Sequence, residues 1–219
     1  MIMAAREIED AIARKDFDQA LALLDGEYGS ALEDREEKIS LCRMGKKYIQ
    51  AREAYDSGLY YTAWKLFRDL GTYDDAAARA QACVIDRPRT GETYHNGEYT
   101  AKGCTLTIKL NNSADTYTYF KIYLVSGSKE ILVSCVFLNG GTPVTVSLPA
   151  GSYVLKTATG KGSWYGEKEM FGDSGSYQRL LYNSGSDTFP LEKNGEYTLT
   201  LNVSSDGNVG SKKESMASF

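Results

Sequence analysis

Within QACVIDRPRTGETYHNGEY, Gln81 to Tyr99, the residue pattern changes from one typical of helices to one typical of strands. Before it the sequence contains no proline, and apolar residues recur at intervals of three and four, which is typical of amphipathic helices. After Arg87 and Pro88 come short alternating strings of Val, Thr and Tyr separated by Gly. The sequence therefore predicts an α+β protein of two domains, an all-α helical-hairpin repeat followed by an antiparallel β-sandwich.

This boundary divides the chain into two parts. The chain has 219 residues, which is enough for two small domains that each bury a core. We expect a helical domain over residues 1–86, a linker over 87–99, a β-sandwich over 100–205 and a polar tail over 206–219.

The first part carries apolar stripes that would form the core faces of helices. Gly58 and Gly71 stand where helices should end. The stripes are Ile8, Ala11 and Ile12; Phe17, Ala20, Leu21 and Leu24; Leu41, Met44, Tyr48, Ala51 and Tyr55; Tyr60, Ala63, Trp64 and Phe67; and Tyr73, Ala76, Ala80 and Cys83.

An internal repeat emerges when the sequence is displaced by 43 positions. The matching pairs are Phe17 with Tyr60, Ala20 with Ala63, Leu23 with Leu66, and Leu24 with Phe67. The string YYTAWKLFRDLGTYDDAAARAQAC, Tyr60 to Cys83, resembles the tetratricopeptide or Sel1-like units of bacterial proteins. This resemblance implies stacked helical hairpins with a short groove of the kind that usually binds peptides.

The second part reads as short strands separated by Gly, Asn and Pro turns at regular intervals. Six or seven strands in about 110 residues fit a small antiparallel sandwich. The predicted strands lie in CTLTIKL from Cys104, TYFKIYLV from Thr118, ILVSCVFL from Ile131, PVTVSLP from Pro143, SYVLKTA from Ser152 and GEYTLTLNV from Gly195.

The run VTVSLPAGSYVLK, Val144 to Lys156, resembles the strand-turn-strand of transthyretin-like and carboxypeptidase-regulatory sandwiches. Together with TATGKGSWYGEKEMFGDSGSY it is similar to an uncharacterised bacterial β-domain family with a "WYG…FG" pattern. The match covers roughly Thr118 to Val203. It implies a fold and no particular activity.

Composition limits the function classes. The chain is 42% hydrophobic and 25% charged with a net charge of −4, whereas nucleic-acid binding needs a basic excess. No run approaches the roughly 20 apolar residues that span a bilayer. We expect a soluble cytoplasmic protein, or an extracytoplasmic one if a leader or anchor precedes this sequence.

The four cysteines are Cys42, Cys83, Cys104 and Cys135, and none forms a CxxC pair for zinc or redox chemistry. Buried reduced thiols are the favoured interpretation. A disulfide between Cys104 and Cys135 would suit a secreted protein.

No catalytic motif is recognisable. GDSG at Gly172 resembles the nucleophile loop of trypsin-like proteases, but the only histidine, His95, falls in the predicted linker. A turn is the better interpretation. No phosphate-binding loop is present, and a single imidazole makes no zinc site. We therefore predict no catalytic residues, no metal site and no cofactor.

The loop GSWYGEKEMFG, Gly162 to Gly172, is the most distinctive feature of the second part. One interpretation is a plug that folds over an open end of the sandwich and buries Trp164 and Phe171. The other is a surface whose aromatic residues anchor a protein, peptide or glycan. The candidate partner-binding residues are Trp164, Tyr165, Glu167, Glu169, Phe171 and Tyr177.

Acids in the same loop suggest two further roles. Glu167, Glu169 and Asp173 could cup a calcium ion, but their spacing matches no known loop, and Lys168 lies between the two glutamates. Solvated surface acids are the better interpretation. Enzymatic use of these acids is disfavoured, because the two carboxylates of a glycosidase face each other across a cleft.

The expected function is a non-enzymatic protein–protein interaction or scaffold module of a bacterial protein. Its partner would be an unknown protein, bound through the helical repeat or the β-domain loop, and a homo-oligomer is a further option. The alternative is a carbohydrate- or cell-envelope-binding module that acts through the Trp164–Phe171 loop. We expect no nucleic acid and no membrane span.

Overall fold

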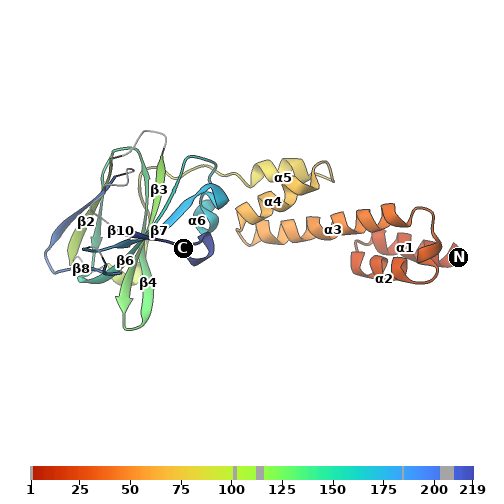
Figure 1. Ribbon diagram of the computed structural model, residues 1–219, viewed down its shortest axis with the longest axis horizontal. Helices are drawn as coiled ribbons and strands as arrows, with labels where there is room; N and C mark the ends of the chain where they lie inside the picture. Colours follow the sequence, from red (N-terminus) through yellow and green to blue (C-terminus); the bar gives the residue numbers. More distant parts are fainter. Residues whose placement is uncertain (1, 101–102, 112–115, 184, 203–209) are drawn as a thin grey trace. The chain divides into compact units, whose positions relative to one another are not determined.

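The computed structural model shows two compact units, Met1–Val84 and Ile85–Phe219, which are described separately (Figure 1). The structure describes residues 2–100, 103–111, 116–183, 185–202 and 210–219. The first unit is all-α and the second is built from two β-sheets, so the predicted fold class is confirmed.

The helical unit contains five α-helices and one short 3₁₀ turn among its described residues. They are α1 (Ile2–Ala13), α2 (Phe17–Asp25), η1 (Gly29–Ala31), α3 (Arg35–Asp56), α4 (Tyr60–Leu70) and α5 (Ala76–Ala82). The 22-residue α3 is the longest, and it lies beside α1 and α2 with its first half and beside α4 and α5 with its second (Figure 1).

Two apolar clusters form the interior of the helical unit, one at each half of α3. The first contains Ile8, Ala11, Phe17, Ala20, Leu24, Ile39 and Cys42. The second contains Tyr48, Ala51, Ala63, Phe67, Leu70, Ala76, Ala80 and Cys83. Ala20 and Ala63 are fully buried, as expected of small residues that let neighbouring helices approach closely.

The turns before α2 and α4 share one geometry. Asp16 has φ −85° and ψ 72°, and Leu59 has φ −91° and ψ 68°. Asp16 N donates to Ala11 O at 2.9 Å, and Leu59 N donates to Ala54 O at 2.9 Å. These positions are 43 residues apart, so the internal repeat predicted from sequence is present in the backbone.

The repeat extends to a third helix. Asp34 precedes α3 with φ −96° and ψ 16°, and Asp75 precedes α5 with φ −98° and ψ 19°. Each aspartate pairs with a basic residue four positions later, Lys38 or Arg79. The repeating unit is therefore three helices long, and α3 is both the third helix of one repeat and the first helix of the next.

The β unit contains ten strands in its described residues. They are β1 (Gly91–His95), β2 (Cys104–Asn111), β3 (Tyr117–Ser126), β4 (Lys129–Asn139), β5 (Val144–Leu148), β6 (Gly151–Gly160), β7 (Ser176–Leu181), β8 (Phe189–Leu191), β9 (Glu196–Asn202) and β10 (Gly210–Lys213). Short helical turns are η2 (Gly97–Tyr99), α6 (Gly166–Glu169), η3 (Gly172–Ser174) and η4 (Met216–Ser218).

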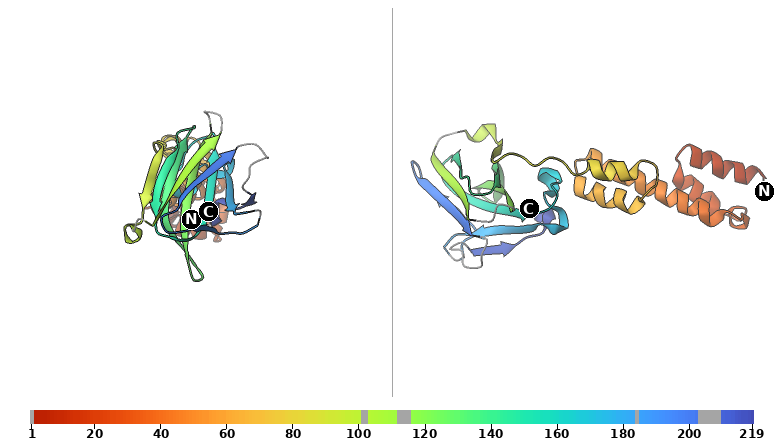
Figure 2. Two further views of the ribbon diagram at one scale, coloured as in Figure 1. Left: turned by 90° about the vertical axis from the view of Figure 1, so that its left-hand side faces the viewer. Right: turned by 90° about the horizontal axis from the view of Figure 1, so that it is seen from above.

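These strands form a seven-stranded and a three-stranded sheet that face each other (Figure 2). The larger sheet has the order β1-β4-β3-β6-β7-β10, and β8 pairs with the beginning of β6. The smaller has the order β5-β2-β9, and its β2–β9 pair is parallel, unlike every other strand pair among the described residues.

The larger sheet is buried on both faces. Its inner face packs Phe120, Ile122 and Val136 against the smaller sheet. Its outer face carries a second cluster that includes Tyr119, Phe137 and residues of the 164–177 segment. The run ILVSCVFL in β4 is apolar except for the buried Ser134, because a strand covered on both sides needs no polar face.

Two segments differ from their predicted roles. The predicted linker, 87–99, contains β1, which pairs with β4 at the edge of the larger sheet. The predicted polar tail, 206–219, contains β10, which pairs with β7, and ends in the buried ring of Phe219. Residues 206–209 of that tail lie outside the described residues. Both segments are held by backbone pairing, which their polar composition does not reveal.

All four cysteines are free and buried, so the Cys104–Cys135 disulfide does not form. Cys104 packs in the cluster between the sheets, and Cys135 packs on the outer face of the larger sheet. The sheet itself separates the two thiols. No helix in the described part of the chain is long and apolar enough to cross a membrane.

Candidate binding site

The aromatic loop lies against the outer face of the larger sheet. Trp164 is only 2% exposed, and its ring packs edge-on against Tyr119, Phe137 and Phe171 with centroid distances of 5.4, 5.3 and 5.2 Å. Such aromatic pairs contribute roughly 0.5–1.5 kcal/mol each beyond the burial of their area. The loop is a cover, as one interpretation of its sequence expected, but it covers a sheet face instead of an end of the sandwich.

The absence of a side chain at Gly160 lets the loop pack closely on the sheet. A Cβ on Gly160 in β6 would lie 2.5 Å from Cγ of Phe171, so only glycine admits the Phe171 ring there. The GDSG segment forms η3, as the turn interpretation predicted, and Ser174 Oγ donates to Phe171 O at 2.7 Å. Tyr177 Oη donates to Gly172 O at 2.8 Å and ties the loop to β7.

The six predicted site residues do not form one exposed patch. Trp164, Phe171 and Tyr177 belong to the buried outer-face cluster. Tyr165 precedes α6, and its backbone N donates to Met170 O at 2.7 Å. Glu167 and Glu169 lie on α6, and Glu167 is exposed. Among the described residues, no group of three His, Cys, Asp or Glu side chains could hold a metal ion.

A polar network occupies the remainder of the outer face. Lys156 Nζ lies 3.2 Å from Glu214 Oε2 and donates to Ser218 O at 2.7 Å. Arg179 pairs with Glu214 at 3.1 Å and with Glu130 at 2.7 Å. Every side chain in this network is at most about one third exposed. It holds the last residues of the sequence against the sheet.

The C-terminal ring is enclosed beside this network. Phe219 packs edge-on against Tyr177 at 5.6 Å, and Lys121 Nζ lies 4.9 Å from the centre of its ring. Tyr123 Oη donates to Phe219 O at 3.0 Å. Burial lowers the pKa of the Lys121 ammonium, and burial raises the pKa of the Cys135 thiol to about 11. The thiol is therefore protonated at neutral pH and a poor nucleophile.

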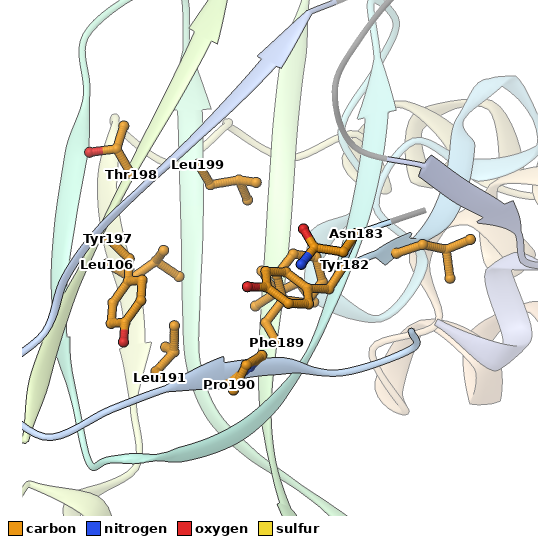
Figure 3. A pocket seen from close by; sticks show the side chains of 11 residues that line it. Leu106, Tyr182, Asn183, Phe189, Pro190, Leu191, Tyr197, Thr198 and Leu199 are labelled. Carbon is orange, nitrogen blue, oxygen red and sulfur yellow. The ribbon is translucent and has the colours of Figure 1, made fainter. Parts of the chain in front are cut away.

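The β unit also has a pocket at its surface. A pocket of about 210 Å³ lies between the edge strand β9 of the smaller sheet and the β7–β8 region of the larger sheet (Figure 3). Apolar side chains dominate its lining, and Tyr182 stands at it with 37% exposure. The lining residues are Leu106, Leu155, Leu181, Tyr182, Asn183, Phe189, Pro190, Leu191, Tyr197, Thr198 and Leu199.

Local contacts fix two aromatic walls of this pocket. Tyr182 packs edge-on against Phe189 with a centroid distance of 5.5 Å. Tyr197 is held by its hydroxyl, which accepts a hydrogen bond from Glu192 N at 2.8 Å. The pocket is thus a preformed apolar hollow in which one side chain or a small apolar group could be buried.

None of the residues that line this pocket was among the predicted site residues. Its lining comes from five strands, β2, β6, β7, β8 and β9, and from the turn after β7. The only local signal is the exposed Tyr182 beside a short apolar strand that contains Pro190. Neither feature points to a pocket without the sheet topology.

The helical unit has a shallower hollow at the junction of its two repeats. It has a volume of about 320 Å³, and an ion pair between Lys47 and Asp69 at 3.0 Å crosses it. The lining residues are Glu36, Ile39, Ser40, Arg43, Met44, Lys47, Asp69 and Leu70.

No protein-family model matches the chain, and no curated protein matches it significantly.

Proposed function

We propose that this chain is a non-enzymatic protein-interaction module. Its helical repeat recruits a protein partner, and its β unit provides a second binding surface. The observation that carries the proposal is the hollow at the junction of the two repeats. Both repeats contribute to it, and its lining combines charged side chains with the apolar side chains of Ile39, Met44 and Leu70. Mixed polar and apolar hollows on stacked helices suit the binding of a polypeptide segment.

The β-unit pocket supports the second surface. Its apolar lining is suited to burying a side chain of a partner, and Tyr is among the residue types enriched at protein interfaces. The carbohydrate-binding alternative receives no support from the position of Trp164. A sugar-stacking tryptophan needs an open ring face, and this ring is covered by Tyr119, Phe137 and Phe171.

Site-specific photo-crosslinking tests the proposal. A benzophenone amino acid replaces Arg43, which lines the junction hollow, or Tyr182, which lines the β-unit pocket. Arg52 is the control for Arg43, because it is an exposed arginine nine residues later on α3 and therefore faces the opposite side of the helix. Tyr94, an equally exposed tyrosine on β1, is the control for Tyr182.

The full chain is expressed in its source cells and irradiated. We expect discrete adducts from the Arg43 and Tyr182 positions, identified by mass spectrometry, that are absent from the Arg52 and Tyr94 positions. Adducts of equal pattern and yield from test and control positions would contradict the proposal.

A further inference from the structure

We propose that the β unit binds an extended peptide segment of a protein partner by adding it as a strand to the free edge of β9. One apolar side chain of that segment then fills the neighbouring pocket. This proposal rests on the proposed function, since it assigns the chemistry of the partner at the second surface.

The backbone of β9 presents unused hydrogen-bonding groups. β9 pairs with β2 in parallel register, with Thr105 opposite Glu196, and Thr105 N donates to Gly195 O at 3.0 Å. In this register the odd-numbered residues of β9 bond to β2, and even-numbered residues such as Thr198 and Thr200 direct N–H and C=O away from it. No strand in the described part of the chain pairs with that outer edge.

The length of this edge suits a peptide. β9 has seven residues, which at roughly 3.3 Å per residue is an edge of roughly 20 Å. An extended peptide satisfies such an edge with main-chain hydrogen bonds, and pockets for alternate side chains then supply specificity. A small apolar ligand would fill the pocket but leave the edge groups of Thr198 and Thr200 unpaired.

The opposite wall of the pocket favours β9 as the strand that is extended. β8 pairs with β6 through Phe189 and Leu191, with Pro190 opposite Ser152. Proline has no N–H, so Pro190 and Ser152 form a non-hydrogen-bonded pair of the ladder, in which the C=O of Pro190 points away from β6. An incoming strand therefore finds both donors and acceptors on β9 and only an acceptor on β8.

The pocket has the size of one side chain. An apolar cavity of about 150 Å³ admits benzene, and this pocket measures about 210 Å³. A Leu, Met or Phe side chain that points from the added strand toward the larger sheet would contact Tyr182, Phe189 and Leu199. Residues on either side of it would face the solvent with Thr198 and Thr200, so the recognised segment alternates polar and apolar residues.

The test uses the full chain and peptides of about nine residues, long enough to cover the seven residues of β9, selected by display from a random library. The selected peptides are resynthesised with single N-methyl groups at each backbone amide. Binding is measured by fluorescence anisotropy. Strand addition predicts that methylation at alternate positions weakens binding by about tenfold or more, and that methylation at the intervening positions has little effect.

Protein variants provide the complementary measurement. Thr198→Pro removes one of the outward N–H groups of β9, that of Thr198. We expect this variant to bind the peptide about tenfold more weakly than the unmodified chain. Thr198→Ala is the matched control, because it loses the same side chain but retains the N–H, and it should bind the peptide about tenfold more tightly than Thr198→Pro. Circular dichroism verifies that both variants are folded, and if Thr198→Pro unfolds, the N-methyl series alone decides the outcome.

Three results would overturn the proposal. One is a library that yields no peptide that binds at the pocket beside Tyr182. Another is equal tolerance of N-methylation at every position, which would identify a side-chain or small-molecule pocket. The third is a dimer of the chain that dissociates in Thr198→Pro and not in Thr198→Ala, which would make a second copy the occupant.

The two proposals fail in different ways. Alternating N-methyl sensitivity without specific photo-adducts from source cells would support strand addition and contradict the recruiting function. Specific adducts at Tyr182 together with uniform N-methyl tolerance would support recruitment and contradict strand addition.

Discussion

The ring of Phe17 in α2 occupies the space that a side chain at Gly45 of α3 would need. A Cβ on Gly45 would lie 2.2 Å from Cζ of Phe17, and both residues are buried. Gly45 therefore stands mid-helix, where glycine costs about 1 kcal/mol relative to alanine, because the contact between α2 and α3 requires it.

Gly45→Ala should lower the stability of the helical unit by roughly 1–3 kcal/mol, because overpacking outweighs the gain in helix propensity. Urea unfolding followed by circular dichroism measures the change. The double variant Phe17→Leu/Gly45→Ala should lose less than the sum of the single variants, since the smaller side chain makes room for the methyl group. Strict additivity would contradict the packing described for this pair.

The fluorescence of Trp164 should report a buried ring. In a Trp64→Phe variant the remaining tryptophan is Trp164, which is 2% exposed among three aromatic rings. We expect a blue-shifted emission that resists quenching by iodide. Trp164→Ala should cost roughly 3–5 kcal/mol of unfolding free energy. A red-shifted and readily quenched emission would mean that the loop stands away from the sheet.

The Cys135 thiol should make the β unit less stable in alkali. Its pKa is raised to about 11 in the folded chain from an ordinary value of 9.0, because burial disfavours the thiolate. The corresponding stability is fully present below about pH 9 and is lost as the pH rises through about 11. The loss attributable to this group is at most roughly 2–3 kcal/mol.

Urea unfolding of the unmodified chain and of Cys135→Ala at about pH 8 and about pH 10.5 isolates this contribution from that of the tyrosines. The difference in stability between the two proteins should shrink at the higher pH, since the variant has no thiol to titrate. A difference that is constant with pH would show that the thiol is not desolvated as described.

The ion pair between Lys156 and Glu214 should be needed to hold the C-terminal segment. Lys156→Met should destabilise the β unit by roughly 1–3 kcal/mol, below the usual loss for a broken buried pair because Arg179 still contacts Glu214. Lys156→Met/Glu214→Gln should recover part of that loss, because it leaves no carboxylate without its ammonium partner. Unfolding measurements on these two variants, on Glu214→Gln and on the unmodified chain form the cycle.

The helical repeat was predictable because it depends on residues that are close in sequence. Ala20 and Ala63 are both fully buried, and the offset of 43 that aligns them also aligns the turns at Asp16 and Leu59. The stripe from Leu41 to Tyr55 predicted a helix through Gly45, but it did not reveal that this helix begins at Arg35 and serves both repeats. Only the contact with Phe17 explains a glycine inside a continuous helix.

The β unit was less predictable because its short strands depend on distant partners. β8 and β10 have three and four residues, too few to show an alternating pattern, and Lys212 and Lys213 look like a solvated tail. A cover was one of two interpretations of the aromatic loop, and its position over a sheet face follows from β4, which carries buried residues on both sides. The open pocket required the complete topology.

The continuity of α3 fixes the rotational phase between the two repeats. An α-helix turns by about 100° and rises by about 1.5 Å per residue, so one residue added between Cys42 and Tyr48 would swing one buried stripe about 100° away from the other. The number of residues between these two side chains therefore sets the angle between the two buried stripes. Apart from Gly45, the segment between them tolerates a change of residue far more readily than a change in the number of residues.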